Sequence, residues 1–254
     1  MFTVKQGFYT KLPNSPQQWS VLNGTPTISS AQALPWASTS GNFSNSGAQT
    51  LRTTNPYPAF NNVGTSDFTW EAWVYAPTLP PAARELWTTE VTAGMGVRLG
   101  RAFSSAQVQN LSLYARGSQD QNFGAITLTA TTWTYLVIQR SATKVEVWYG
   151  NLGAGTASYT DATSTFTGGT AVGYNYANAN VGGGVILAGF GGTTTSSNLF
   201  FGEVRMSNIA RYTQVGGVNI PTTFLPFDNN TTQLLQFQNR PGSTAFLNTT
   251  NTPT

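Results

Sequence analysis

Short runs of β-branched and aromatic residues are the feature of this sequence that most limits its fold. The runs recur between clusters of Gly, Asn, Pro and Ser, and the three-to-four-residue spacing of an amphipathic helix is almost absent. The pattern predicts a nearly all-β chain that folds as a two-sheet antiparallel sandwich. The predicted strands cover Phe68–Tyr75, Gly96–Arg101, Leu111–Arg116, Ile126–Leu128, Thr134–Gln139, Lys144–Tyr149, Val185–Phe190, Leu199–Met206 and Gln233–Phe237.

The run FTWEAWVY carries large side chains on both faces of its predicted strand. Side chains alternate along a strand, so one face receives Phe68, Trp70, Ala72 and Val74, and the other receives Thr69, Glu71, Trp73 and Tyr75. Because a strand that is apolar on both sides lies between layers, we expect it to be central, together with residues 134–139 and 199–206. Trp73 and Trp133 are expected in the core. Residues 141–143 should close a hairpin.

The first 60 residues contain six of the 13 prolines and few clean alternations. We therefore expect an N-terminal arm at residues 1–45 and the sandwich at residues 46–254, with the first sandwich strand near Thr50–Thr53. An isolated monomer would have difficulty burying four apolar side chains close to the start of this arm, namely Phe2, Val4, Phe8 and Tyr9. The arm either docks against a partner or lies as a flap over the chain's own core.

A low content of charge restricts the classes of partner. Only 8% of the residues are charged, against about 25% in an average soluble domain. The net charge of +3 and the isoelectric point near 9.3 come from scattered side chains, with no Lys/Arg cluster, so no nucleic-acid binding is expected. With so little charge to keep copies apart, we expect a homo-oligomer or a complex with other proteins.

Apolar runs of the length needed for export or membrane insertion are missing from the sequence. The N-terminus lacks the apolar core of a secretory signal, and no stretch reaches the roughly 18 apolar residues of a membrane helix. The chain has no cysteine, which excludes disulfides and thiolate metal sites.

The residues available for catalysis are few. Without histidine the chain cannot build a Ser-His-Asp or Cys-His site. A glycosidase needs two carboxyl groups about 5 to 9.5 Å apart, but no two of the nine carboxylates occupy alternate positions of one predicted strand. We therefore expect no enzymatic activity. The carboxylates are Asp67, Glu71, Glu85, Glu90, Asp120, Glu146, Asp161, Glu203 and Asp228.

No cofactor is expected, although calcium is left open at two clusters of oxygen ligands. One is Asp120 with Asn122, and the other is Asp228 with Asn229 and Asn230. Both clusters are explained more simply as turns, because Asn and Asp side chains bond their own backbone there.

The best candidate for a carbohydrate site is the Gly-flanked segment GYNYANANVGGG. Sugar binding needs flat rings for stacking and amides for hydrogen bonds. The segment supplies both through Tyr174, Asn175, Tyr176, Asn178 and Asn180. The alternative is that the tyrosines pack on a neighbouring strand or subunit.

Four segments, in order, resemble the laminin-G-like, concanavalin A-like lectin/glucanase superfamily, in the version found in phage and bacterial surface proteins. Gly64–Pro77 is similar to the strand that opens the domain, and Pro221–Gln238 to its Pro/Phe loop and final strand. Residues 131–151 are similar to its central hairpin, with Tyr135 where the family often has His and with matches by kind at Trp133, Arg140, Tyr149 and Asn151. Leu199–Thr213 is similar to its closing segment, with Gly202 in place of the usual Asp and with matches at Glu203, Val204, Arg205, Ser207, Ala210, Arg211 and Tyr212.

The resemblance implies a concanavalin A-like jelly roll. Arg205 comes two residues after Glu203 and shares a strand face with it, so the two are candidates for a structural ion pair, with a catalytic role as the alternative. The E-x-D-x-x-E pattern of the glucanase relatives is absent. Together with the missing signal, the resemblance implies a non-enzymatic phage virion structural protein that is made in the host cytoplasm and lies on the virion surface. It would decorate the capsid or form part of a tail or fibre, with other virion proteins, its own copies and a glycan as partners. The alternative is a receptor- or polysaccharide-binding lectin module, and a glycoside hydrolase is third.

Overall fold

The structure is a computed structural model that describes eleven stretches of the chain. All the regular secondary structure in these stretches is β-strand. None of the stretches contains a helix long and apolar enough to cross a membrane. The described residues are 19–43, 49–53, 66–79, 84–88, 95–99, 110–115, 119–141, 144–161, 186–188, 198–238 and 240–242.

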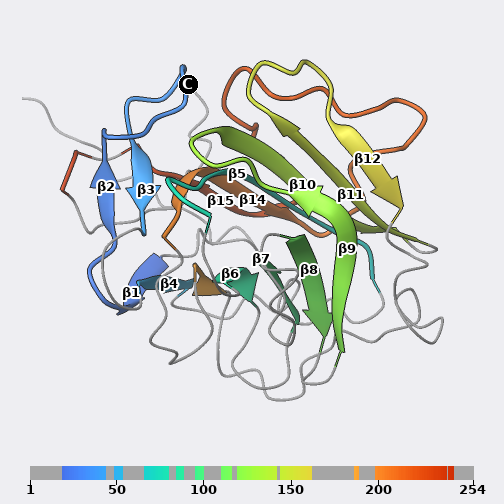
Figure 1. Cartoon of the computed structure of the whole chain (residues 1–254), viewed down its shortest axis with the longest axis horizontal. Coiled ribbons are helices and arrows are strands. Elements are labelled where there is room, and N and C mark those ends of the chain that lie inside the picture. Colours follow the sequence, from blue (N-terminus) through green and yellow to red (C-terminus); the bar gives the residue numbers. More distant parts are fainter. Residues whose placement is uncertain are drawn as a thin grey trace, which may run out of the picture.

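The strands form two antiparallel sheets that pack face to face (Figure 1). The seven-stranded sheet has the order β1 (Trp19–Asn23), β4 (Thr50–Thr53), β13 (Ile186–Leu187), β6 (Arg84–Thr88), β7 (Met95–Leu99), β8 (Asn110–Ala115) and β9 (Gln119–Thr127). The eight-stranded sheet has the order β12 (Ser158–Asp161), β11 (Lys144–Asn151), β10 (Trp133–Ser141), β5 (Phe68–Tyr75), β14 (Phe200–Ser207), β3 (Ser40–Asn42) and β2 (Thr27–Ser29), and β15 (Thr231–Gln236) pairs with β14.

The chain crosses repeatedly from one sheet to the other, as in a jelly roll. Strands β3, β4, β5 and β6 alternate between the sheets, and so do β12, β13 and β14. This topology confirms the predicted two-sheet antiparallel jelly-roll sandwich. The three strands predicted to be central, β10, β5 and β14, are neighbours in the middle of the eight-stranded sheet.

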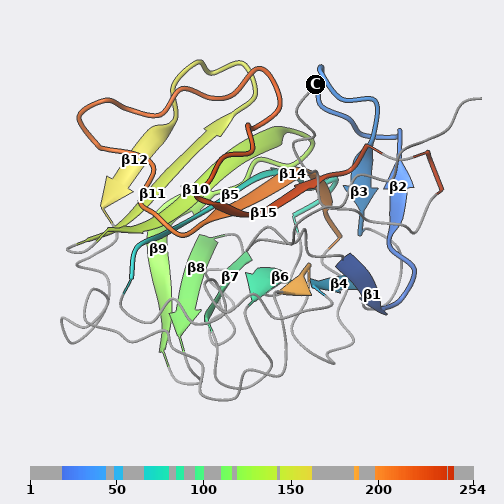
Figure 2. The same ribbon diagram turned by 180° about the vertical axis from the view of Figure 1, so that it is seen from behind.

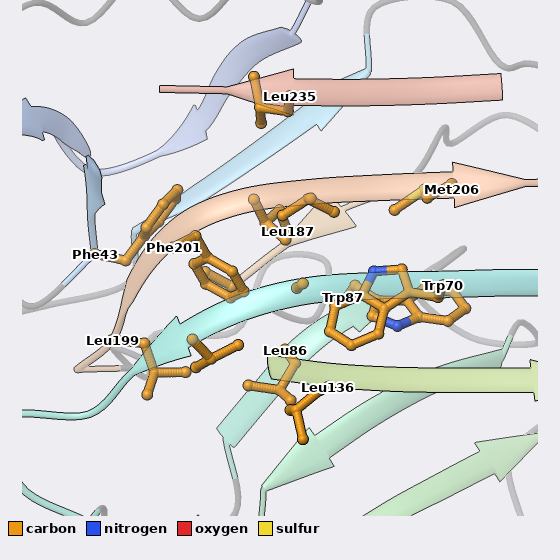
Figure 3. Close-up of a cluster of buried hydrophobic side chains, with 14 of the residues drawn as sticks. Phe43, Trp70, Leu86, Trp87, Leu136, Leu187, Leu199, Phe201, Met206 and Leu235 are labelled. Atoms are coloured by element: carbon orange, nitrogen blue, oxygen red, sulfur yellow. The ribbon is translucent and has the colours of Figure 1, made fainter. Parts of the chain in front are cut away.

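The main core lies between the two sheets (Figure 3). Trp70 on β5 stacks on Trp87 of the opposite sheet, with ring centroids 5.7 Å apart. Phe43 packs edge-on against Phe201 and Phe237 at centroid distances of 5.4 and 6.2 Å. The predicted alternation along β5 is confirmed, because the face with Trp70 enters this core and the face with Trp73 does not.

A second apolar layer covers the outer face of the eight-stranded sheet, and we call it the outer layer. It includes Trp73, Tyr135 and Trp148, all fully buried. Residues 208–230, which connect β14 to β15 and which we call the covering segment, run along this outer side in both views (Figure 1, Figure 2). Both faces of the central strands are therefore buried, as the sequence predicts.

The sandwich begins earlier than predicted. Three strands, β1, β2 and β3, precede Thr50, and Trp19 and Ile28 within them are 5% and 2% exposed. Residues 19–43 therefore belong to the two sheets and not to a separate arm. These strands are only three to five residues long, too short to show a clear alternation. The arm residues Phe2, Val4, Phe8 and Tyr9 lie outside the described residues.

Candidate functional site: a buried polar network under the covering segment

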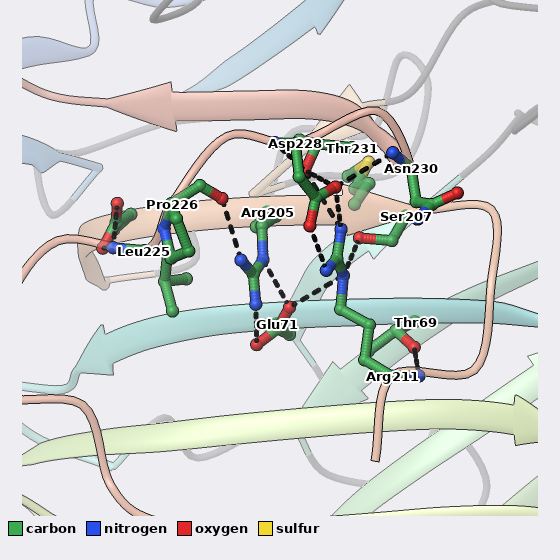
Figure 4. Close-up of polar contacts among 12 residues, drawn as sticks. Thr69, Glu71, Arg205, Ser207, Arg211, Leu225, Pro226, Asp228, Asn230 and Thr231 are labelled. Carbon is green, nitrogen blue, oxygen red and sulfur yellow. Dashed lines mark hydrogen bonds and ion pairs between the residues drawn. The ribbon is translucent and has the colours of Figure 1, made fainter. Parts of the chain in front are cut away.

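A buried ion pair between neighbouring strands is the centre of the polar residues on the outer face (Figure 4). Antiparallel register places Arg205 of β14 directly opposite Glu71 of β5. Arg205 Nε donates to Glu71 Oε2 at 2.6 Å, and Arg205 Nη2 donates to Glu71 Oε1 at 3.1 Å. The two side chains are 4% and 0% exposed. Two parallel charge-assisted bonds between buried side chains make this a geometrically specific contact.

Two tyrosines complete the surroundings of Glu71. The hydroxyls of Tyr135, on β10, and Tyr212, in the covering segment, both donate to Glu71 Oε1. Burial, and then the charge of Glu71, raise the pKa of each phenol above its ordinary value, so both stay protonated donors at neutral pH. Burial alone would lower the pKa of Arg205, but Glu71 outweighs it and the net shift is upward. Both carboxylate oxygens of Glu71 thus accept hydrogen bonds from the chain's own groups.

A second arginine fastens the two ends of the covering segment to each other. Arg211 donates to the two carboxylate oxygens of Asp228 at 2.6 and 2.7 Å, and to the hydroxyl of Thr231 at 3.0 Å. These hydrogen bonds from Arg211 hold the pKa of Asp228 well below its usual range. The Asn230 amide also donates to Asp228 Oδ1 at 2.9 Å, so the interpretation of this cluster as a turn is confirmed. Both carboxylate oxygens of Asp228 thus accept hydrogen bonds from Arg211.

Gln139 and Thr69 bind the backbone where the covering segment begins. Gln139 Oε1, on β10, accepts the amides of Arg211 and Tyr212 at 2.7 and 2.9 Å. Its Nε2 donates to the carbonyl of Tyr212 at 2.9 Å and to Glu146 Oε2 at 3.0 Å. Thr69 Oγ1, on β5, donates to the Ile209 carbonyl at 2.7 Å. Polar side chains of the sheet thus form the hydrogen bonds that the backbone of the covering segment would otherwise lack.

Glu203 does not pair with Arg205, and this prediction is corrected. Glu203 and Arg205 are two residues apart on β14, so their side chains lie on the same face but next to each other along the strand. Glu71 lies directly opposite Arg205 on the neighbouring strand β5. Glu203 instead accepts the Leu225 amide with both oxygens, at 2.9 and 3.0 Å, and the Gln236 Nε2 donor at 2.6 Å. Burial raises the pKa of Glu203 to about 7, and the hydrogen bonds from Gln236 and Leu225 oppose this shift.

Gly202, where the resembled family has Asp, has no room for a side chain. It lies at a register shift between Phe201 and Glu203. A Cβ atom there would come within 2.5 Å of Leu34 Cδ1 and 3.2 Å of Trp73 Cβ. The loop that carries Leu34, which is 1% exposed, therefore packs where the Asp would stand.

The described carboxylates of the network are already bound by the chain's own donors. No group of three or more potential metal-binding side chains occurs among the residues with described positions. Figure 4 shows Glu71, Arg205, Arg211 and Asp228 converging between the strands and the covering segment. The arrangement can fix a long connection onto a sheet and exclude water from its contacts.

The structure brings together residues that sequence reasoning had placed in separate motifs. Glu71 comes from the first matched segment, Tyr135 from the second, and Arg205, Arg211 and Tyr212 from the third. Gln139 and Asp228 were not predicted as members of a network. The predicted glycan residues Tyr174, Asn175, Tyr176 and Asn178 lie outside the described residues, and so does the side chain of Asp120.

Comparisons with known proteins give only remote similarities. No protein-family model matches the sequence, and no curated protein matches it significantly. Among solved structures, a Bacteroides ovatus protein named as a candidate carbohydrate-binding protein matches with a TM-score of 0.49 and 12% identity, over 93% of this chain and 59% of that chain. The binding domain of botulinum neurotoxin DC matches with a TM-score of 0.48 and 9% identity, over 77% and 44%.

A third similar structure is tailspike protein 2 of an Escherichia coli O157:H7 bacteriophage. Its TM-score is 0.47 and its identity is 10%, over 80% of this chain and 27% of the tailspike. The chain thus spans less than two thirds of the length of each of these solved chains.

Proposed function

We propose that the chain is a non-catalytic structural and binding module on the surface of a virus particle, in which the jelly-roll sandwich is a rigid scaffold. The observation that carries the proposal is that the carboxylates on the outer face are bound by hydrogen bonds from the chain itself. Glu71, Glu203 and Asp228 each accept at least two hydrogen bonds from the chain's own groups. Glu71 and Glu203 are fully buried. Groups held in this way support a scaffold, because catalysis needs a carboxyl that can reach a substrate.

The composition supports a place in an assembly. With only 8% charged residues, a surface relies on hydroxyl and amide groups for hydration and has little charge to repel a neighbouring copy. The resemblance of four segments to phage and bacterial surface domains favours a virion over other assemblies. Capsid decoration and a tail or fibre appendage are both consistent with these properties.

A receptor- or polysaccharide-binding lectin module is the second candidate. The fold supports it because sandwiches of this kind present loops at the ends of two rigid sheets. The tyrosines and asparagines at positions 174–178 are the residues that we propose for glycan contact. The partner would be a neutral or weakly charged polysaccharide at a cell surface.

The experiment that separates binding from catalysis uses the intact chain and several polysaccharides. Laminarin, other β-glucans, alginate and host surface polysaccharide are incubated with the protein, and both binding and the release of reducing ends are measured. We expect no release. Turnover that disappears in Glu90→Gln or Glu203→Gln would overturn the non-enzymatic assignment.

The glycan residues need a matched control in a different loop. We expect the double substitution Tyr174→Ala and Tyr176→Ala to abolish any polysaccharide binding that the intact chain shows. Gln214→Ala, at an exposed position of the covering segment, should leave that binding unchanged. Equal affinity of the double variant and the intact chain would remove this loop from the proposal.

The N-terminal arm is proposed as an assembly contact, and a truncation has to avoid the strands. Removing residues 1–30 deletes β1 and β2 and should unfold the sandwich. Replacing Phe2, Val4, Phe8 and Tyr9 by Ser tests the contact without changing any of the described strands. We expect loss of oligomers or of particle attachment in analytical ultracentrifugation. Normal assembly of this variant would place the contact elsewhere.

A further inference from the structure

Glu203 and Arg205 bind two consecutive backbone groups of the covering segment. Glu203 accepts the Leu225 amide with both oxygens, and Arg205 Nη1 donates to the Pro226 carbonyl at 2.9 Å. Both side chains come from β14, and the segment that they hold lies across that strand (Figure 4). Leu225 itself is 5% exposed and packs in the outer layer. This stretch of the covering segment, residues 221–230, is fixed at its centre by one carboxyl group and one guanidinium.

The two charged residues that hold this stretch have different surroundings. Arg205 is neutralised by Glu71, whereas Glu203 forms no ion pair with any described residue. Strands β3 and β15 and residues 30–37, which also border this region, contain no charged residue. The charged groups that act on Glu203 are Arg205, which lowers its pKa, and Glu71, which raises it and also forms the ion pair with Arg205.

The ion pair between Arg211 and Asp228 lies at the ends of the covering segment and does not contact Glu203. An ionised Glu203 is therefore a buried anion with hydrogen bonds but no contacting cation, and such a group is costly to bury. The protonated carboxyl avoids this cost and keeps an acceptor oxygen for the Leu225 amide.

We propose that Glu203 is a pH-dependent clamp, whose protonated form holds residues 221–230 on the sheet and whose ionised form favours their release. Release would lift Leu225 and Phe227 from the outer layer, where they pack with Trp73. It would uncover an apolar surface of the kind that binds other proteins. The clamp is independent of the proposed glycan contact and of the proposed assembly arm.

The direction of the pH effect follows from the two states of Glu203. Its pKa is about 7 in the closed form, against 4.5 for a solvated Glu, so the closed form binds the proton more tightly. The opening equilibrium therefore rises by up to tenfold per pH unit between about 4.5 and about 7 and is constant above that range. With a fully solvated Glu203 in the open form, the whole change is at most about 300-fold, and between pH 5 and pH 8 it is at most about 70-fold.

Hydrogen–deuterium exchange of the intact chain tests the clamp. Rates for the peptide that covers residues 221–230 are measured at pH 5 and pH 8 and divided by the intrinsic exchange rate at each pH. We expect the opening equilibrium to be larger at pH 8 than at pH 5, by up to about 70-fold. Peptides from β10 serve as the internal reference and should change much less. An equal change in both peptides would mean global unfolding and would overturn a local clamp.

Variants identify the titrating group. Glu203→Gln should remove the pH dependence of residues 221–230, whereas Glu146→Gln, a second buried glutamate bound by Gln139 and Tyr159, should keep it. The Gln236 hydrogen bond opposes the upward shift of the Glu203 pKa, so Gln236→Met should move the opening of residues 221–230 to higher pH. This second variant tests the clamp even if Glu203→Gln does not fold. An unchanged pH dependence in Glu203→Gln, or an unshifted transition in Gln236→Met, would overturn the proposal.

Discussion

Arg205 and Glu71 form a bidentate ion pair that joins β14 to β5 beneath the covering segment. The Nε–Oε2 distance is 2.6 Å, and neither side chain is more than 4% exposed. Pairs of this kind are strongly destabilising to break, because removing one partner leaves an uncompensated buried charge. The pair therefore links the stability of the sheet to the position of the covering segment.

Arg205→Met should lower the free energy of unfolding by about 3 to 5 kcal/mol, because the buried Glu71 loses its closest cation and keeps only Arg211, whose Nε is 3.9 Å from Glu71 Oε2. Urea denaturation measures the difference. Lys144→Ala is the matched control, since Lys144 and Asp161 form a pair with side chains that are 40% and 42% exposed. Its loss should cost less than about 1 kcal/mol. Equal effects of the two substitutions would contradict the assigned role of the buried pair.

Asp228→Asn should alter the stability of the chain in acid. The pKa of Asp228 is lowered in the folded state by hydrogen bonds from Arg211. The resulting stabilisation is present above pH 3.8, which is the ordinary pKa of an Asp, and is lost as the pH falls below that value. We expect a smaller drop in the urea midpoint between pH 5 and pH 2.5 in the variant than in the unmodified chain. Parallel pH profiles would show that Arg211 does not stabilise the ionised Asp228.

Trp73→Ala should lower the free energy of unfolding by about 3 to 5 kcal/mol. Trp73 is fully buried and packs against Trp36 and Tyr135, with ring centroids 5.7 and 5.3 Å away. Trp133→Ala, at a position that is 6% exposed, should fall in the same range. A loss below about 1 kcal/mol, the centre of the range for ordinary substitutions, would show that the outer layer contributes little to the fold.

Gly41→Ala should destabilise the chain by about 1 to 3 kcal/mol through overpacking. A Cβ atom at Gly41 would lie 2.4 Å from Phe237 Cε1, and the ring of Phe237 is itself buried. Gly216→Ala is the control, because its Cβ atom would have only an ordinary contact, with Thr213 Oγ1 at 3.5 Å. Thermal melting should separate the two, and similar melting temperatures would rule out the close packing of β3 on Phe237.

The central strands could be predicted from the sequence because local pattern and environment agree there. In β5 large side chains alternate between the two faces at a period of two, and both faces are buried. β1, β2 and β3 could not be predicted in this way. Each has only three to five residues, and its place depends on pairing with strands far along the chain, such as β3 with β14.

The sequence singled out Glu203 and Arg205 as a pair, but it did not predict the polar network or the true partners of these two residues. The motif around Glu203 and Arg205 indicated two charged residues on one face, and proximity in sequence suggested that they pair. The true partner of Arg205 is set by the register of β14 against β5, which places Glu71 opposite it. The role of Glu203 depends on where residues 221–230 cross the sheet, and that path is a tertiary property.

Locating the chain on intact particles tests the proposed virion role most directly. Virions purified from the cells that produce this protein are examined by electron cryomicroscopy, and the same preparation is analysed by mass spectrometry. We expect peptides of this chain in the particles and density on the outer surface of the capsid or tail that fits the two-sheet sandwich. Purified particles without its peptides and without such density would contradict the virion role.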